Sequence, residues 1–255
     1  MNGLRAALWV EARKAATARV LYAGAVLLIA GTGILGASLT VAVEAGNDQI
    51  TAKLGQTADV AGWPLMIATV TQIVAAGALL AFGITLSWVF GREFTDGTVY
   101  GLFALPVTRT AQTAAKFIVH FGWSVVAAAV LTGLVALAGF AIGLGGIDAP
   151  IAEGLGRLFT LCAMSGLVAA PAAWAATFGR GPMAGIAATI GLIVLAQVAV
   201  LAFPEASAWF PIAAPALWAS RPDQVTGVQL ALTPAFAIGF AALTAWAWKR
   251  LQLDR

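Results

Sequence analysis

Residues 64–90 read PLMIATVTQIVAAGALLAFGITLSWVF and contain no Asp, Glu, Lys or Arg. At about 1.5 Å of rise per residue, a helix of roughly 20 residues crosses a hydrocarbon core about 30 Å thick, so this stretch is long enough to cross a bilayer. Five further stretches share this freedom from charge: 20–43, 117–147, 158–179, 181–204 and 224–248. The sequence therefore predicts an integral membrane protein with six spans.

The composition leads independently to the same class. Hydrophobic residues make up 61% of the chain and charged residues 10%, against about 45–50% and about 25% in soluble domains. Backbone groups in lipid need internal partners, and unbroken apolar runs without alternation favour helices over a barrel. We expect an all-α integral membrane protein, residues 1–255 forming one transmembrane domain. The expected transmembrane helices are 20–43, 64–90, 113–144, 158–179, 183–204 and 227–248.

The basic residues predict the orientation. Eleven of the fourteen Lys and Arg fall on one side when the loops are read alternately, and three fall on the other, namely Lys53, Arg157 and Arg221. Cytoplasmic loops carry the Lys and Arg excess, so both termini are expected in the cytoplasm. The net charge of +3 is explained by this topology and by contact with anionic lipids, and no nucleic-acid partner is expected.

Two segments outside the spans are expected to lie at the membrane surface. Residues 1–19 predict a helix that either lies at the cytoplasmic interface or simply extends the first span. Residues 205–226 interleave proline with tryptophan and phenylalanine, and proline prevents one continuous helix there. Short re-entrant or interfacial helices on the outer face are expected, with an ordinary apolar loop as the alternative.

The cytoplasmic loop at residues 91–110 has the most specific pattern, and it begins GREFTDGTVYGLFALPVTR. Thr95 or Asp96 can cap a short helix and Pro106 ends it. Apolar residues at i, i+3 and i+4 share one face of that helix, and charged residues flank it. The face consists of Val99, Leu102 and Phe103, and the flanking charges are Arg92, Glu93, Asp96 and Arg109. An exposed apolar face of this kind needs a partner or the membrane surface.

This loop resembles the first cytoplasmic loop of ABC-2 type transporter permeases. The similarity lies in a glutamate, a Gly-Thr pair, a short helix and a Pro-Val-Thr-Arg run, here Glu93, Gly97, Thr98 and 106–109. Six spans, cytoplasmic termini, an N-terminal helix and re-entrant helices before the last span also match that family, in its type V exporter-like form.

The resemblance implies that residues 91–110 form a coupling helix seated on a separate ATPase subunit. Val99, Leu102 and Phe103 would pack in its groove, and Arg92, Glu93 and Arg109 would fix the orientation. The implied assembly has two ABC ATPase subunits and a second permease, either another copy or a related chain, in a bacterial inner membrane. The implied function is export of hydrophobic or amphipathic cargo such as a drug, an antibiotic, a peptide or a lipid.

The chain lacks the pattern of an ATP site. A Walker A loop needs a glycine directly before its lysine, and none of the four lysines follows a glycine. We therefore expect no enzyme activity and no cofactor in this chain, with ATP and magnesium held by the partner subunit.

Other functions have less support. Intramembrane proteolysis would need a nucleophile with a base or a metal-ligand set, and only His120 and Ser165 offer isolated candidates, so catalytic and metal sites are not expected. An ion-coupled secondary transporter, or another polytopic protein without an ATPase, remains the alternative, although its spans usually carry ionisable groups at mid-membrane. Small-residue pairs at Gly139 and Gly143 and at Gly181 and Gly185 favour close helix packing.

Overall fold

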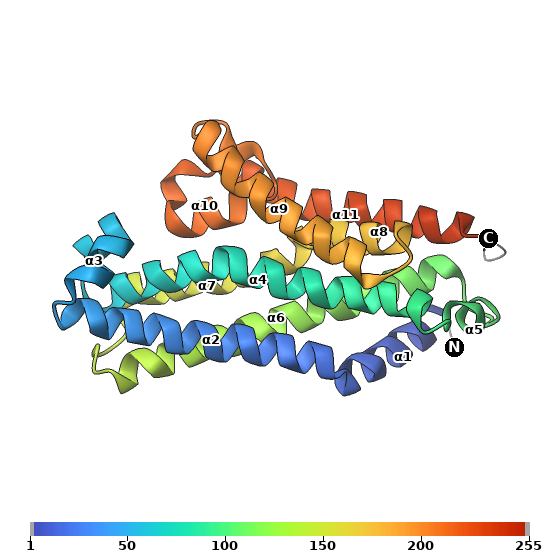
Figure 1. Cartoon of the computed structure of the whole chain (residues 1–255), viewed down its shortest axis with the longest axis horizontal. Helices are drawn as coiled ribbons and strands as arrows, with labels where there is room; N and C mark the ends of the chain where they lie inside the picture. The colour runs from blue at the N-terminus through green and yellow to red at the C-terminus, as the bar shows by residue number, and fades with distance from the viewer. Residues whose placement is uncertain (1–2, 253–255) are drawn as a thin grey trace.

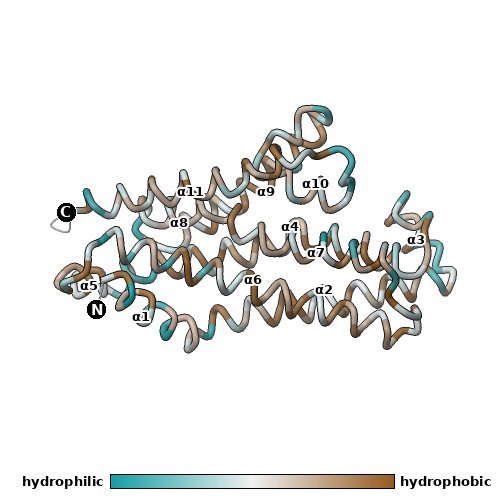
Figure 2. The backbone as a smooth tube through the Cα atoms, turned by 180° about the vertical axis from the view of Figure 1, so that it is seen from behind, coloured by the Kyte–Doolittle hydropathy of each residue, from teal (hydrophilic) through white to brown (hydrophobic). Residues whose placement is uncertain are grey.

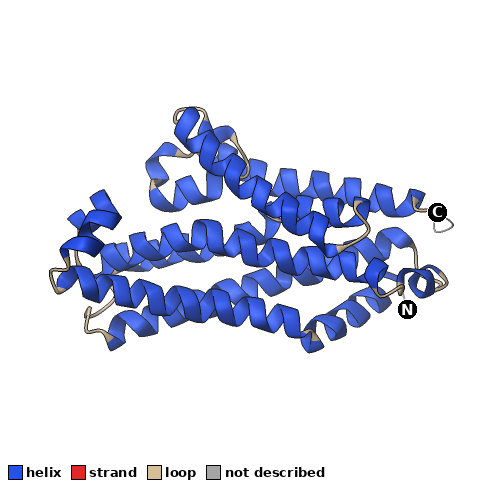
Figure 3. Cartoon of the chain, viewed as in Figure 1, coloured by secondary structure: helices blue, strands red, loops and turns tan. Residues whose placement is uncertain are grey.

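The structure, a computed structural model, describes residues 3–252, and within that range every regular element is helical (Figures 1 and 3). Most helices run nearly parallel to the long axis of the molecule, and the described ends of the chain lie together at one end. The elements are α1 (Gly3–Thr17), α2 (Arg19–Glu44), α3 (Asp48–Leu54), η1 (Gly55–Asp59), α4 (Gly62–Thr95), α5 (Val99–Phe103), α6 (Arg109–Ala141), α7 (Ala149–Val168), α8 (Ala170–Phe178), α9 (Pro182–Ala202), η2 (Ser207–Trp209), α10 (Ala214–Ser220), η3 (Pro222–Gln224) and α11 (Gly227–Arg250).

Six helical segments in the described range are long and apolar enough to cross a membrane, as the charge-free stretches predict. Hydrophobic residues predominate in the middle of the long helices, and hydrophilic residues gather towards the ends of the bundle (Figure 2). The segments are Arg19–Glu44, Gly62–Thr95, Arg109–Ala141, Ala149–Phe178, Pro182–Ala202 and Gly227–Arg250. The all-α fold class is confirmed.

The helices extend beyond several expected spans. The second segment runs on to Thr95, so residues 91–95, expected in the loop, complete the helix α4. The fourth begins at Ala149 and not near residue 158, because Asp148 caps it by accepting a hydrogen bond from the backbone of Ile151. A charged side chain near the end of a span can reach the interface without ending the helix, which is why charge alone misplaces these boundaries.

Prolines accompany the interruptions in the helices. Between α7 and α8 the chain leaves the helix at Ala169, two residues before Pro171, which lacks the N–H that would continue the ladder. Residues 205–226, expected as a re-entrant segment, consist of the short pieces η2, α10 and η3, and α10 packs against α4, α7 and α11.

Helix α4 is the centre of the bundle, since it packs against α2, α7, α8 and α9. Glycines permit two of the closest contacts. A side chain at Gly139 would collide with the ring of Trp63, and one at Gly185 would collide with Ser87 of α4. These two positions come from the two glycine pairs that predicted close packing. Gly143 instead ends its helix with φ +83°, and Gly181 lies in the turn before α9.

Candidate functional site: the loop between α4 and α6 and its ion cluster

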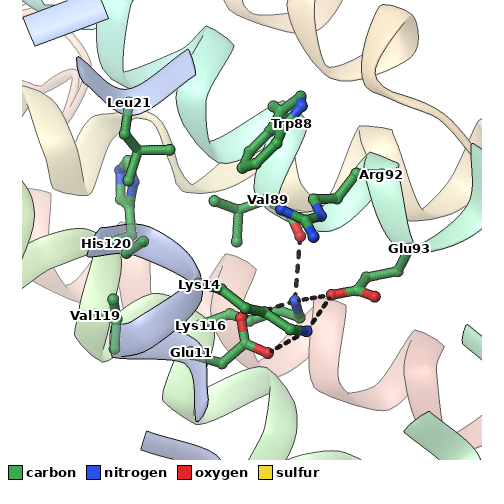
Figure 4. Close-up of a pocket in the computed structure, with 11 residues that line it drawn as sticks. Glu11, Lys14, Leu21, Trp88, Val89, Arg92, Glu93, Lys116, Val119 and His120 are labelled. Atoms are coloured by element: carbon green, nitrogen blue, oxygen red, sulfur yellow. Dashed lines mark hydrogen bonds and ion pairs between the residues drawn. The ribbon is translucent and has the colours of Figure 1, made fainter. Parts of the chain in front are cut away.

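Four charged side chains meet beneath the loop between α4 and α6 (Figure 4). They come from three helices, and we call them the ion cluster: Glu11 and Lys14 of α1, Glu93 of α4 and Lys116 of α6. Both carboxylates and Lys116 are buried, and Lys14 is partly exposed. Burial of separate charges would be prohibitive, but here two acids face two lysines.

Lys116 is the most constrained member. Its Nζ lies 2.7 Å from Glu93 Oε1 and 3.1 Å from Glu11 Oε2, and it donates a third hydrogen bond of 3.2 Å to the carbonyl oxygen of Val89. An ammonium group has three N–H donors, so the donors of this buried lysine are all used. This saturation fixes the start of α6 against both α1 and α4.

Lys14 joins the same two carboxylates from the solvent side, 3.0 Å from Glu11 and 2.9 Å from Glu93. Burial by itself would lower the pKa of the Lys14 ammonium. The adjacent Glu11 and the hydrogen bond to Glu93 outweigh that effect and raise the pKa above its ordinary value. Lys14 therefore remains charged and keeps α1 attached to the end of α4.

The Glu-x-x-x-Gly-Thr part of the loop motif is explained by this arrangement. Gly97 has φ +68°, a left-handed conformation that favours glycine, and it turns the chain out of α4. The turn brings the Thr98 hydroxyl back to donate a hydrogen bond to Glu93 Oε2. The motif thus ties Thr98, the N-cap residue of the loop helix α5, to the ion cluster.

The Pro-Val-Thr-Arg part connects the loop to two further helices. The side chain of Thr108 caps α6 by accepting a hydrogen bond from the backbone N–H of Ala111. Arg109 Nη1 donates to the carbonyl oxygens of Trp248, Lys249 and Leu251, at 3.1, 3.3 and 3.0 Å. A cation at the last carbonyls of a helix favours the helix dipole, so Arg109 serves as the C-terminal cap of α11.

Trp248 lies at the centre of an aromatic cluster at this end of the bundle. Its ring meets Phe90, Phe94 and Phe103 edge-on, with centroids 5.7, 6.2 and 5.8 Å away, and its indole N–H donates to Thr177. Arg109 lies over the Phe103 ring at 3.8 Å. The loop helix α5 is therefore packed on the end of α11.

The predicted apolar face exists, but it points into the chain. Val99 is 3% exposed, while Leu102 and Phe103 are partly buried, and Phe103 contacts Trp248. Helical spacing shows which side chains share a face and leaves the direction of that face undetermined. Val99 is therefore covered by its own bundle and Phe103 helps to anchor α5 there, and the contact of this face with a partner groove stays a prediction.

The other predicted loop residues are divided between the interior and the surface. Glu93 is buried in the ion cluster, so it does not face a partner as expected. Arg92 lies over the Trp88 ring at 4.4 Å and 3.9 Å from Asp96, which is exposed. Thr95 and Asp96 do not cap α5, whose N-cap residue, Thr98, makes no capping bond. Pro106 is exposed at the tip of the loop.

The surface of the loop consists of small and apolar residues, of which the sequence analysis singled out only Pro106. Tyr100 is 58% exposed and Leu105 50%, and Gly101, Ala104 and Pro106 are exposed beside them. We call these five residues the loop face. They lie in α5 and in the turn that follows it, at positions other than those of Val99, Leu102 and Phe103.

A comparison with known families places this arrangement. A profile of ABC-2 family transporter proteins matches residues 8–197, which include the whole ion cluster and the loop. This chain belongs to the ABC-2 transporter family. It is thus a multi-pass membrane permease of an ABC transporter, and its family associates with ABC ATPase subunits. A search of curated proteins finds no match.

The ABC-2 permease contains site residues that the sequence analysis missed. Lys14 and Lys116 entered only the count of basic residues, Glu11 had no role beyond the helix expected at residues 1–19, and Trp248 marked the end of a span. A signal was present in Lys116, because a lysine two turns inside an apolar helix needs a buried carboxylate partner. The partners themselves are separated along the chain, Glu11 from Lys116 by 105 positions.

His120 lies one helical turn beyond Lys116. It is 4% exposed, its ring meets Phe82 edge-on at 6.1 Å, and neither ring nitrogen has a hydrogen-bond partner among the described residues. It lines the same hollow as the four residues of the ion cluster (Figure 4).

Proposed function

We propose that this ABC-2 permease is the membrane-spanning subunit of an ATP-driven exporter, moved through the loop between α4 and α6. The observation that carries the proposal is the ion cluster. Glu93 connects α1, the beginning of the loop and α6 at one point, so a force applied to the loop face would displace these elements together. A loop bound only to the bilayer would need no such internal anchoring.

The energy source is a separate subunit in this proposal. The ABC-2 family associates with ABC ATPases, and no lysine of this chain follows a glycine as a Walker A loop requires. ATP and magnesium would then be held by two partner ATPases. They would serve two permeases, either two copies of this chain or this chain and a relative.

The loop face is the surface proposed to contact the ATPase. Its apolar side chains Tyr100 and Leu105 offer burial, and Arg92 and Asp96 lie beside them for polar contacts. The inward face of Val99, Leu102 and Phe103 would hold the helix rigid while the outward face binds. Closure of the ATPases on nucleotide would move the loops, and the long helices α4 and α6 would follow as semi-rigid levers.

The direction and cargo follow from the same reading. The end that carries the loop and the described chain ends would be cytoplasmic, since eleven of the fourteen basic residues belong to that side. Cargo would be hydrophobic or amphipathic, because the helices offer apolar surfaces with few charged groups, and it would move outward across a bacterial inner membrane.

Reconstitution tests the proposal. The permease is purified alone and together with a candidate ATPase, and ATP turnover is measured in proteoliposomes. We expect no ATP turnover from the permease alone. The ATP turnover of the ATPase should differ between the ATPase alone and the complex with the permease. ATP hydrolysis by the isolated chain, with contaminating ATPases excluded by a mock purification from cells that lack the permease, would contradict it.

The ion-coupled carrier makes the opposite prediction for one residue. A carrier without an ATPase would depend on His120, the single histidine of the chain. In the exporter, His120→Ala removes a packed ring and leaves ATP-dependent activity in place. Transport that needs no ATP and is abolished by His120→Ala would favour the carrier.

A further inference from the structure

A cleft opens in the half of the bundle away from the ion cluster. It consists of two adjoining hollows of about 490 and 400 Å³, which share the lining residues Gln72 of α4 and Ser220 of α10. The first hollow lies among α4, α7 and the end of α10, and the second lies among α4, α9 and α10. Their shared lining makes them one continuous surface.

The cleft results from the way α9 crosses α4. Near the loop end the two helices touch, since a side chain added at Gly83 would collide with Thr189 and one added at Gly91 would collide with Pro182. Further along, α9 diverges from α4, as Figure 1 shows. The short helix α10 packs against α4 without filling the space between them.

The two hollows differ in chemistry. The hollow between α4 and α9 is lined mainly by aliphatic side chains, among them Ala76, Leu79, Ile193 and Val200. The other hollow also has apolar lining, including Ile67 and Ile151, but it adds two arginines, Arg157 and Arg221, and several hydroxyl and amide groups. Among the described residues that line either hollow there is no aspartate or glutamate.

Arg157 has unused hydrogen-bonding capacity. Its Nε is buried and has no hydrogen-bond partner among the described residues. Its ion pair with Glu153, on the preceding turn of α7, measures 4.0 Å, and the Glu153 side chain is 75% exposed. An exposed pair at this distance contributes little, so the guanidinium remains able to bind an anion.

The position of the arginines is itself informative. The basic-residue asymmetry leaves only three Lys and Arg on the side away from the loop, and two of these three line the cleft. Basic residues on that side oppose the usual bias of membrane proteins. Two arginines in one hollow offer positive charge to an anionic ligand.

We propose that the cleft binds an amphipathic anion, with a carboxylate or phosphate head between Arg157 and Arg221 and an apolar chain between α4 and α9. Arginine forks match the paired oxygens of such heads, and the aliphatic lining would remove the chain from water. The inference rests on the proposed function and narrows its cargo to anionic amphiphiles.

Binding is measured on the permease alone, without an ATPase, in nanodiscs of phosphatidylcholine. The probe is a long-chain fatty acid bearing a diazirine, compared with an alkylammonium and an alcohol of the same chain length and diazirine position. Photolabelled peptides are mapped and affinities are measured by titration. We expect the fatty acid to label α4, α9 or α10 and to bind more tightly than both other probes.

Four variants sharpen the test. In the Arg157→Gln, Arg221→Gln double variant the fatty acid should bind at least about tenfold more weakly, a loss of about 1.4 kcal/mol. Arg157→Lys, which keeps the charge, should lose less. Ala76→Trp should weaken all three probes by filling the apolar hollow. Arg5→Gln, with the same charge change at the far end of the bundle, should bind like the wild type.

Equal binding of the carboxylate and ammonium probes, or wild-type affinity in the double arginine variant, would overturn the inference. If phosphatidylglycerol added to the nanodiscs competes with the fatty acid, a membrane lipid is the source of the anion. If phosphatidylglycerol does not compete, a soluble anion is favoured. If the cleft binds as expected but no ATPase drives export, the proposed function fails alone. If ATP-driven export proceeds unchanged in the double variant, the cleft inference fails alone.

Discussion

Lys116 Nζ lies 2.7 Å from Glu93 Oε1, and both side chains are only 1% exposed. The pair joins the end of α4 to the start of α6, the two long helices that flank the loop between them. Lys14 and Glu11 bring α1 into the same contact, and Thr98 brings in the loop itself. One buried carboxylate thus connects four elements at the end of the bundle where an ATPase is proposed to bind.

Substitution of Glu93 tests this connection. Glu93→Gln leaves Lys116 with less compensation in a buried site, so we expect a loss of about 3 kcal/mol or more of unfolding free energy, near the usual cost of breaking a buried pair. Thermal unfolding in detergent, followed by tryptophan fluorescence, measures the change.

The matched control is Glu93→Gln combined with Lys116→Met, which removes the unpaired charge as well. It should recover part of the lost stability, because a buried ion pair replaced by an apolar group costs less than a broken one. Equal melting of Glu93→Gln and the wild type would contradict the role assigned to the ion cluster.

Arg109 is predicted to be irreplaceable by lysine. Arg109→Lys retains the charge but loses the guanidinium plane that stacks on Phe103, and a shorter ammonium has to reach the three carbonyl oxygens that Nη1 binds, so we expect about 1–2 kcal/mol of destabilisation. Arg92→Lys, at a residue that stacks on Trp88 at the surface, should cost less. Chemical unfolding of both variants gives the comparison, and a smaller effect at Arg109 than at Arg92 would count against the α11 cap.

Orientation is tested by cysteine labelling in a Cys162→Ala background, where the single native cysteine, which is buried, has been removed. Cysteines at Asn47 and Asp148, which precede α3 and α7, should react with an impermeant maleimide in intact cells. Cysteines at Thr95 and Gln252 should react only after permeabilisation. The eleven-to-three distribution of basic residues is the reason for this expectation. Labelling of the cysteine at Thr95 in intact cells would show that the orientation is the reverse of the predicted one.

The transmembrane helices were predictable because the relevant signal is local. A charge-free run such as 64–90 has to be helical in lipid whatever it packs against, and its helix is present. The ends were less predictable. Arg92 and Arg157 look like loop residues in a charge count, yet each lies within a helix, Arg92 in the last turn of α4 and Arg157 in the first half of α7.

The site was only half predictable for the opposite reason. The motif identified the loop, and glycine and threonine in it have local roles that a sequence can suggest. Its internal partners are distant in sequence: Arg109 caps α11 at Trp248, and Lys116 reaches Glu11 on α1. The direction of the Val99 face depends on those contacts, so it could not be derived from helical spacing.

The central claim is that the loop face binds an ATPase, and Leu105→Asp tests it most directly. A Leu102→Asp, Phe103→Asp double variant is a poorer test, because Phe103 packs against Trp248 and its loss would damage the permease itself. Leu105 is 50% exposed, so its substitution should leave melting unchanged. Val60→Asp, at a residue 44% exposed on the opposite end of the bundle, is the matched control.

The measurement is co-purification of each variant with its candidate ATPase, with ATP turnover of the complex measured in proteoliposomes. We predict that Leu105→Asp weakens assembly at least about tenfold, since an aspartate buried in an apolar contact costs more than about 1.4 kcal/mol, while Val60→Asp assembles like the wild type. Wild-type assembly and turnover of a normally folded Leu105→Asp variant would contradict the account.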